Sequence, residues 1–172
     1  MELFKEEIKD MKTLKEFVKN KEEILDDYEV AVIVYAFDKD NKIIFQRRGP
    51  GCRDEVLKLE TIGGRVKESD IDFKSALNRE IVEEVGTDAN IEIEEFITAT
   101  YAKTFDVRYN KEQAWIYVVY KGSLKSGELK IKEPNKCLGY ERYKIGEVNL
   151  EDLSKGAIEL YKIVSEKYSY LK

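Results

Sequence analysis

The stretch Gly63–Thr87, GGRVKESDIDFKSALNREIVEEVGT, decides how the rest of the chain is interpreted. It begins with two glycines, continues as a short polar turn, and then predicts a helix that ends at Gly86. Within this helix Glu80, Glu83 and Glu84 have the spacing i, i+3 and i+4, which places their carboxylates within an arc of about 100°. Like charges at this spacing repel each other. A divalent cation would relieve the repulsion, and carboxylate oxygens suit Mg²⁺ or Mn²⁺.

The alternative is that the three acids form only a solvated face, because the chain has 35 acidic residues. Leu77, Ile81 and Val85 recur at i, i+4 and i+8, which gives the same helix an apolar edge beside the acidic one. The carboxylates are therefore expected next to the core and not at the point farthest from it. We expect Ser69 or Asp70 to cap the start of the helix.

Composition limits the class of protein. A chain of 172 residues with 42% hydrophobic and 38% charged residues indicates one globular domain with a heavily charged surface. The net charge of −5 argues against broad nucleic-acid binding, which relies on a basic surface. The absence of histidine excludes Ser-His-Asp and Cys-His catalysis and His-ligated zinc. Any acid–base catalysis must therefore use Glu, Asp, Lys, Tyr or a metal-bound water.

The cysteine pattern and the hydropathy indicate a location. Cys52 and Cys137 lie far apart without metal-binding spacing, which is typical of proteins from a reducing compartment. The N-terminus has no apolar signal-peptide core, and no apolar run has the length of a membrane span. We therefore expect a cytoplasmic protein with no membrane partner.

The remaining segments predict strands and helices around the opening stretch. We expect an amphipathic helix within 1–26, a closing helix at 150–168, a turn at 106–111, and strands at 28–37, 42–47, 56–62, 91–104, 112–120 and 139–148. The N-terminal helix is expected either to cover the sheet or to form a homodimer contact. This order predicts a single α+β domain over residues 1–172, with a mixed sheet between helices.

Two groups outside the helix are candidates for substrate contacts. Arg47, Arg48 and Arg53 form a local basic cluster, and arginine forks bind phosphate bidentately. The alternative is that these arginines form salt bridges to Asp54 and Glu55.

The strand at 112–120 contributes the second group. Its residues Trp115, Tyr117 and Val119 are expected to face the same way. The aromatic rings among them either stack on a base or belong to the core of the sheet.

The opening stretch resembles the Nudix box, in which a Gly, five residues, a Glu and seven residues precede R-E-U-x-E-E-x-G-U, where U is aliphatic. The second half of the pattern is matched by Arg79, Glu80, Ile81, Glu83, Glu84 and Gly86. Counting forward from Gly64 puts the acidic position at Asp70, whereas counting back from Arg79 puts it at Ile71. The turn therefore carries a one-residue insertion.

The resemblance implies a Nudix-type α/β/α sandwich and Mg²⁺-dependent hydrolysis of a nucleoside diphosphate linked to another group. It implies that Glu80 and Glu84 are direct metal ligands, with Glu83 and the carbonyl of Gly64 close by. It also implies that Arg79 orients the carboxylates by ion pairing. A metal ion at this place would lower the pKa of the attacking water.

The remaining roles follow from the same resemblance. Glu83, Glu84 and Arg79 are the implied catalytic residues, and Arg47 and Arg48 are expected to meet substrate phosphate. The general base is either a box glutamate or one from a later loop, where Glu112 and Glu133 are the candidates. Two other functions stay open: a Nudix-fold nucleotide-binding module without turnover, and an isoprenyl-diphosphate isomerase-like enzyme, for which Cys52 is the relevant side chain.

Overall fold

The computed structural model describes residues 1–107 and 109–172. Its α-helices are α1 (Met11–Val18), α2 (Phe73–Val85) and α3 (Lys155–Lys167). Short 3₁₀ helices occupy Leu150–Asp152 and Ser169–Leu171. The strands are β1 (Glu2–Phe4), β2 (Tyr28–Phe37), β3 (Ile43–Arg48), β4 (Leu59–Glu60), β5 (Ile62–Arg65), β6 (Asn90–Asp106), β7 (Lys111–Ser126) and β8 (Cys137–Tyr143).

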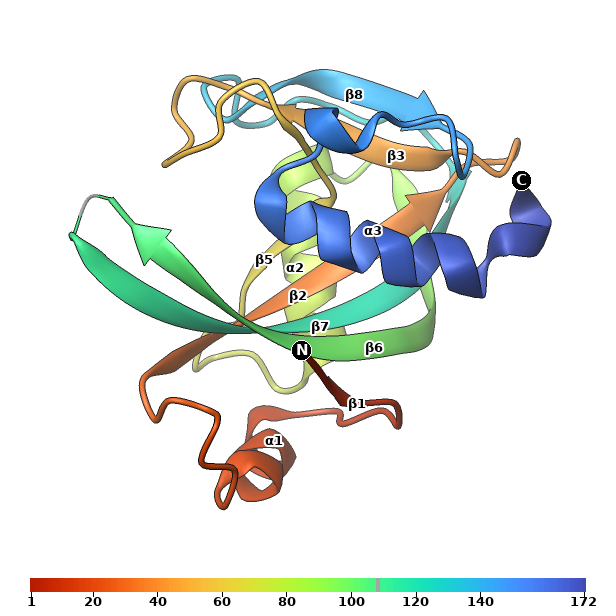
Figure 1. The fold of residues 1–172 in the computed structure, drawn as a ribbon. Coiled ribbons are helices and arrows are strands. Elements are labelled where there is room, and N and C mark those ends of the chain that lie inside the picture. The colour runs from red at the N-terminus through yellow and green to blue at the C-terminus, as the bar shows by residue number, and fades with distance from the viewer. Residues whose placement is uncertain (108) are drawn as a thin grey trace.

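One mixed sheet organises the fold. The strand order is β1-β6-β7-β2-β3-β4, with β5 paired to β2 and β8 paired to β3. The pairing of β2 with β7 is parallel, and the other pairings are antiparallel. The long β6 and β7 form a hairpin whose end projects from the body on the left of Figure 1.

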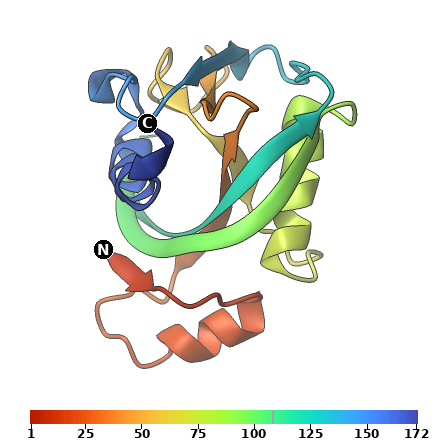
Figure 2. The ribbon, with the colours of Figure 1, turned by 90° about the vertical axis from the view of Figure 1, so that its right-hand side faces the viewer.

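The helices lie on both sides of this sheet. In Figure 2, α2 and α3 stand on opposite sides of the curved strands, and the N-terminal segment lies below them. Two separate apolar cores follow from this arrangement. Val32 and Val34 of β2 pack with α2 residues, whereas Tyr35 and Phe37 pack with α3 residues. The predicted mixed sheet between helices is confirmed.

The N-terminal segment is less helical than expected. Its helix is limited to Met11–Val18, where Oδ1 of Asp10 accepts the Thr13 N–H at 2.8 Å. Residues 2–4 instead form β1 and pair with β6, because a strand there satisfies the open edge of the sheet. Leu14 and Val18 are buried in the chain's own core, which is the covering role. The homodimer contact stays a prediction.

The predicted caps of α2 are corrected at one end and confirmed at the other. Asp72, and not Ser69 or Asp70, caps the helix, and its Oδ1 accepts the Ser75 N–H at 2.7 Å. Asp70 is held elsewhere by an ion pair described below. Gly86 ends the helix with a φ of 85°, which suits glycine.

The boundaries of other strands and helices differ from the predicted ones because of local pairing and turns. The strand expected at 56–62 is divided into β4 and β5, which pair with different partners. The closing helix begins only at Lys155, after the short 3₁₀ turn at Leu150–Asp152. The segment expected as one strand or two from residue 91 is the single long β6. The turn expected at 106–111 includes residue 108, which lies outside the described residues.

Candidate active site

The glycine pair of β5 receives two carboxylates from α2. Oε2 of Glu84 accepts the backbone N–H of Gly63 at 3.0 Å, and Nε2 of Gln46 donates to Oε1 of the same carboxylate at 3.3 Å. A β-carbon on Gly64 would collide with the carboxylate of Glu80. The absence of a β-carbon at Gly64 therefore allows the carboxylate of Glu80 to lie directly against the strand. Gly63 and Gly64 therefore leave the backbone of β5 open to the acidic edge of α2.

Arg79 joins the polar turn to the acidic helix. Its Nε and Nη2 donate to the two carboxylate oxygens of Asp70 at 2.9 and 2.7 Å, and Nη1 donates to Glu80 at 2.5 Å. These bonds hold the pKa of the Asp70 carboxyl below its usual value. The acidic position that forward counting assigned to Asp70 is thus the partner of Arg79. Glu83 is exposed, and its oxygens lie 3.4 Å from Arg79 and Lys67.

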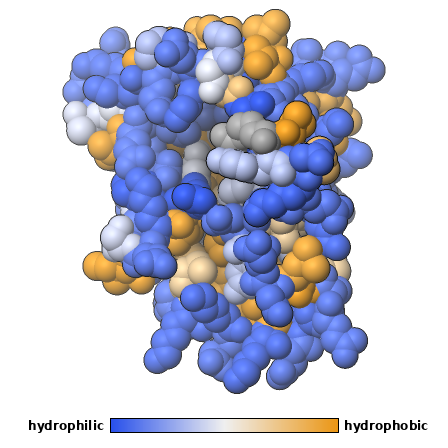
Figure 3. All heavy atoms as spheres, turned by 90° about the vertical axis from the view of Figure 1, so that its left-hand side faces the viewer, coloured by the Kyte–Doolittle hydropathy of each residue, from blue (hydrophilic) through white to orange (hydrophobic). Residues whose placement is uncertain are grey.

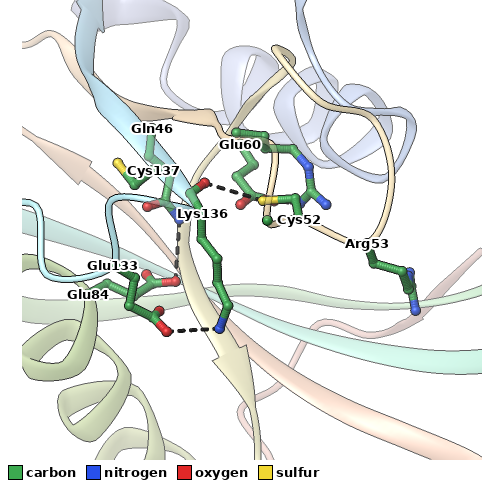
Figure 4. A pocket seen from close by; sticks show the side chains of 10 residues that line it. Gln46, Cys52, Arg53, Glu60, Glu84, Glu133, Lys136 and Cys137 are labelled. Atoms are coloured by element: carbon green, nitrogen blue, oxygen red, sulfur yellow. Dashed lines mark hydrogen bonds and ion pairs between the residues drawn. The ribbon is translucent and has the colours of Figure 1, made fainter.

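A cavity of about 260 Å³ opens beside Glu84, whereas Glu80 and Glu83 do not line it (Figure 4). One set of lining side chains is acidic: Glu60, Glu84 and Glu133. A second set is basic: Arg48, Arg53 and Lys136. The cavity therefore combines groups that attract cations with groups that attract phosphate.

Burial shapes the chemistry of the acids in this cavity. Burial raises the pKa of Glu84 well above its usual value, and the charges of Glu60 and Glu80 raise it further. Burial also raises the pKa of Glu60, although Arg48 opposes the shift. A nearby cation would favour the charged forms of these carboxyls.

The donor set fits a hard divalent ion, because it consists of carboxylate and carbonyl oxygens. The described part of the chain contains no group of three His, Cys, Asp or Glu side chains already placed to hold a metal ion. The acids around Gly64 are instead engaged with Arg79, Gln46 and backbone N–H groups. An ion at this place would therefore compete with the hydrogen bonds of those carboxylates.

The two predicted substrate arginines have different environments. Arg47 donates through Nε and Nη2 to the two oxygens of Glu141, each at 2.6 Å. It lines neither this cavity nor the larger one between the sheet and α3. Arg48 pairs with Glu60 and, at 2.9 Å, with Asp54, and it lines the acidic cavity. The alternative of salt bridges to Asp54 is thus observed for Arg48.

The candidates for a general base are also separated. Glu133 lines the cavity, and its carboxylate accepts a hydrogen bond from Nζ of Lys136 at 2.8 Å. Glu112 is exposed near the start of β7 and lines neither cavity. Sequence reasoning missed Glu60, Gln46 and Lys136. The one available signal was that Glu60 lies three residues before the glycine pair.

Cys52 and Cys137 both line the small cavity. Burial raises the pKa of both thiols, so neither is activated as a thiolate. Sγ of Cys52 lies 3.2 Å from the carbonyl oxygen of Lys136, which holds the two cavity loops together. The cysteine chemistry that kept the isomerase-like alternative open receives no support from these environments.

A second and larger cavity, of about 800 Å³, lies between the sheet and the beginning of α3. It is lined by Gly63 and Gly64 and by the aromatic side chains of Trp115 and Tyr117. Three residues line both cavities: Arg48, Arg53 and Glu60. The large cavity is therefore a cleft that continues into the acidic one.

No helix in the described part of the chain is long and apolar enough to cross a membrane.

Comparisons with known proteins agree with this geometry. A family model described as NUDIX domain matches residues 27–164. A comparison with curated protein sequences found no match. The chain is similar to the solved structure of a MutT NUDIX hydrolase from Burkholderia pseudomallei, with 21% identity, a TM-score of 0.61, and coverage of 79% of this chain and 97% of that one.

Two further solved structures show the same likeness. A MutT protein from Methanosarcina mazei is 17% identical, with a TM-score of 0.63 and coverage of 83% of this chain and 98% of that one. The NUDIX domain of Shewanella oneidensis NrtR, solved with ADP ribose, is 16% identical, with a TM-score of 0.63 and coverage of 89% and 97%. At these identities the likeness is evidence for the fold alone.

Proposed function

This chain belongs to the Nudix family, and from that membership we propose that it is a Mg²⁺-dependent hydrolase of a nucleoside diphosphate linked to another group. The family hydrolyses acid anhydrides and generally uses divalent cations. The finer assignment to Mg²⁺ and to a diphosphate linkage rests on the residues of the site. Mn²⁺ would fit the same oxygen donors.

One observation carries the proposal: acidic and basic side chains share the small cavity. Glu84 contacts the glycine pair at Gly63, Glu60 comes from β4, and Lys136 reaches into the cavity from the loop before β8 (Figure 4). A diphosphate with a bound cation has the complementary pattern, because its metal seeks carboxylates and its oxygens seek arginine and lysine. A neutral substrate would offer a partner to neither set of charges, which in the free protein pair with each other at Arg48–Glu60 and Lys136–Glu133.

We propose that the side chains that bind the metal come from α2. Glu80 and Glu84 would hold the ion, with Glu83 nearby and the carbonyl of Gly64 as a further oxygen. When bound, the ion supplies positive charge to the diphosphate and lowers the pKa of the attacking water. Arg79 acts as a positioning residue, because it ties Glu80 to the turn at Asp70.

The remaining steps use side chains of the cavity. Water attacks phosphorus, its oxygen forms the new P–O bond, and the P–O bond to the bridging oxygen breaks. Glu133 accepts the proton of that water, and Lys136 holds the Glu133 side chain in place by a hydrogen bond. Arg48 binds substrate phosphate, whereas Arg47 is held by Glu141 and does not line the cavity.

A panel of nucleotide substrates tests this proposal. Purified protein is incubated with nucleoside diphosphate sugars, ADP-ribose, dinucleoside polyphosphates and nucleoside triphosphates, with Mg²⁺, Mn²⁺ or EDTA. Release of a nucleoside monophosphate that requires the metal is the expected result. The absence of release from every substrate, with the protein folded and metal present, would contradict it.

A second candidate function is a nucleotide-binding module without turnover. The observation in its favour is that the described carboxylates are engaged in hydrogen bonds and form no ready-made metal site. Calorimetric titration of the same panel distinguishes the two functions. Nucleotide binding without hydrolysis under any metal condition would establish the binding module.

A further inference from the structure

The floor of the large cleft combines two aromatic side chains with small neighbours. Tyr117 of β7 lies opposite Thr100 of β6 and opposite Ala31 of β2. Trp115 lies opposite Ala102 of β6 and opposite Glu29 of β2, whose side chain pairs with Arg65. Side chains stand roughly perpendicular to a sheet, so short neighbours leave open space beside the tall rings.

The two rings form a parallel stack. The ring centroids of Trp115 and Tyr117 are 6.0 Å apart, with an interplanar angle of 10°. Burial raises the pKa of Tyr117 to about 12, so its ring stays neutral at physiological pH. Each ring is only partly buried, although the residues that alternate with them on β7 are fully buried. Tyr117 packs against the core on the α3 side, and the exposed part of each ring faces the cleft.

The hairpin end supplies apolar side chains on another side of the cleft. Phe105 is 53% and Val107 is 71% exposed, and both line the cleft. Figure 3 faces the hairpin side of the molecule, where apolar patches interrupt a largely hydrophilic surface. Nη1 of Arg53 lies 3.2 Å from Oδ2 of Asp106, so the hairpin end is tied to the loop that borders both cavities.

The surrounding charges narrow the chemistry of the occupant. Arg65, Lys103 and Lys155 line this cleft together with the acidic Asp54, Glu55 and Glu159, and this rim of mixed charge favours a polar ligand over a hydrocarbon chain. A flat ring that carries polar atoms at its edge satisfies both the aromatic floor and the charged rim. An isoprenyl group would satisfy the floor and leave the rim without partners.

We propose that this cleft binds the nucleobase end of the substrate, stacked on the Trp115–Tyr117 pair and covered by Phe105 and Val107. The inference rests on the proposed function, since the cleft joins the diphosphate cavity at Arg48, Arg53 and Glu60. The diphosphate then runs past the glycine pair, and the second group of the substrate lies beyond the small cavity.

Trp115 is the only tryptophan in the chain, and it reports directly on this cleft. The experiment titrates the EDTA-treated protein with AMP and with ribose 5-phosphate while tryptophan fluorescence is recorded. The two probes differ only in the base. A free tryptophan derivative corrects for absorption by AMP. We expect saturable quenching by AMP, and at least about tenfold weaker binding of ribose 5-phosphate.

Matched variants locate the effect. Phe105→Ala should weaken AMP binding by about five- to a hundredfold, which is the usual range for loss of a ring stacked on a base. Tyr109→Ala is the control, because Tyr109 is 68% exposed on the same hairpin but does not line the cleft. Tyr117→Phe keeps the ring and should bind AMP like the parent protein, whereas Tyr117→Leu should bind it more weakly.

Equal binding of AMP and ribose 5-phosphate would overturn the inference, and so would unchanged AMP binding in Phe105→Ala. Because the titration needs neither metal nor turnover, its result is independent of hydrolysis. Base-dependent quenching in a protein without hydrolase activity would support the cleft assignment and contradict only the proposed function.

Discussion

The carboxylate of Glu80 occupies the space in which a β-carbon on Gly64 would stand. The carboxylate of Glu80 can therefore lie against the strand because position 64 has no side chain. Any larger residue at position 64 must push Glu80 away from the strand or shift α2. The proposed metal site thus depends on a glycine as directly as on its acids.

Gly64→Ala is expected to lower turnover by about 100-fold or more, because a ligand displaced by even 1 Å loses its proper geometry. Gly139→Ala is the matched control, since a β-carbon on Gly139 of β8 meets nothing within 4 Å. Its activity and its melting temperature should stay close to those of the parent protein. Parent-like kcat/KM in Gly64→Ala would show that Glu80 need not remain beside the strand.

Glu84→Gln is expected to abolish measurable turnover while the fold persists. The amide removes a carboxylate oxygen from the proposed metal site, yet its remaining carbonyl still accepts the N–H of Gly63. The amide loses the hydrogen bond that Gln46 donates to Oε1, but burial opposes the charged form of Glu84, so the free energy of unfolding should fall by no more than about 1 kcal/mol. Circular dichroism and a steady-state assay separate the two effects. Glu92→Gln, an exposed glutamate on β6, serves as the control.

The assignment of the general base is tested by a pair of variants. Glu133→Gln is expected to lower kcat by about 10²–10⁴, the usual contribution of general base catalysis, whereas Glu112→Gln should leave it unchanged. The difference arises because Glu133 lines the cavity and Glu112 does not. Rates are measured at saturating Mg²⁺, so that weaker metal binding does not imitate the effect. A loss of kcat in Glu112→Gln alone would reverse the assignment.

The local parts of the site were predictable from sequence. The spacing of Glu80, Glu83 and Glu84 follows from the helical period, and Gly86 ends the helix as its conformational freedom allows. The order of strands along the chain could be predicted because β2 and β7 are rich in β-branched and aromatic residues.

The parts that depend on long-range pairing were not predictable. Glu60 and Lys136 meet in one cavity only because β3 pairs with both β4 and β8. The N-terminal segment has an amphipathic pattern, but its first residues form a strand because the edge of β6 is available in the folded state. Arg47 is directed to Glu141 by the same β3–β8 pairing, which no local pattern reveals.

Acid stability should depend on Glu94, which lies on β6 away from the candidate site. Burial opposes the shift, but hydrogen bonds from Lys121, Ser123 and Lys125 lower the pKa of Glu94 from 4.5 to about 2. A carboxyl with a lowered folded-state pKa stabilises the protein above its unfolded-state pKa, and this stability is lost as the pH falls toward the folded-state value. Glu94→Gln should therefore lower the urea midpoint at pH 7 and have little effect near pH 2. An equal loss at both pH values would contradict this linkage.

Metal binding should stabilise the folded protein in proportion to its affinity. An ion that binds only the folded state raises the melting temperature by mass action, by roughly 5–10 °C when free Mg²⁺ is about 100 times its Kd. Because Glu80 and Glu84 are the proposed ligands, the Glu80→Gln/Glu84→Gln double variant should lose this rise. NaCl at matched ionic strength controls for screening of the net charge of −5. An equal rise with NaCl would show that screening and not ion binding causes it, and an equal rise in the double variant would place the ion elsewhere. No rise at millimolar Mg²⁺ would mean that the ion binds only together with the diphosphate, which a repeat with a non-hydrolysable nucleotide distinguishes.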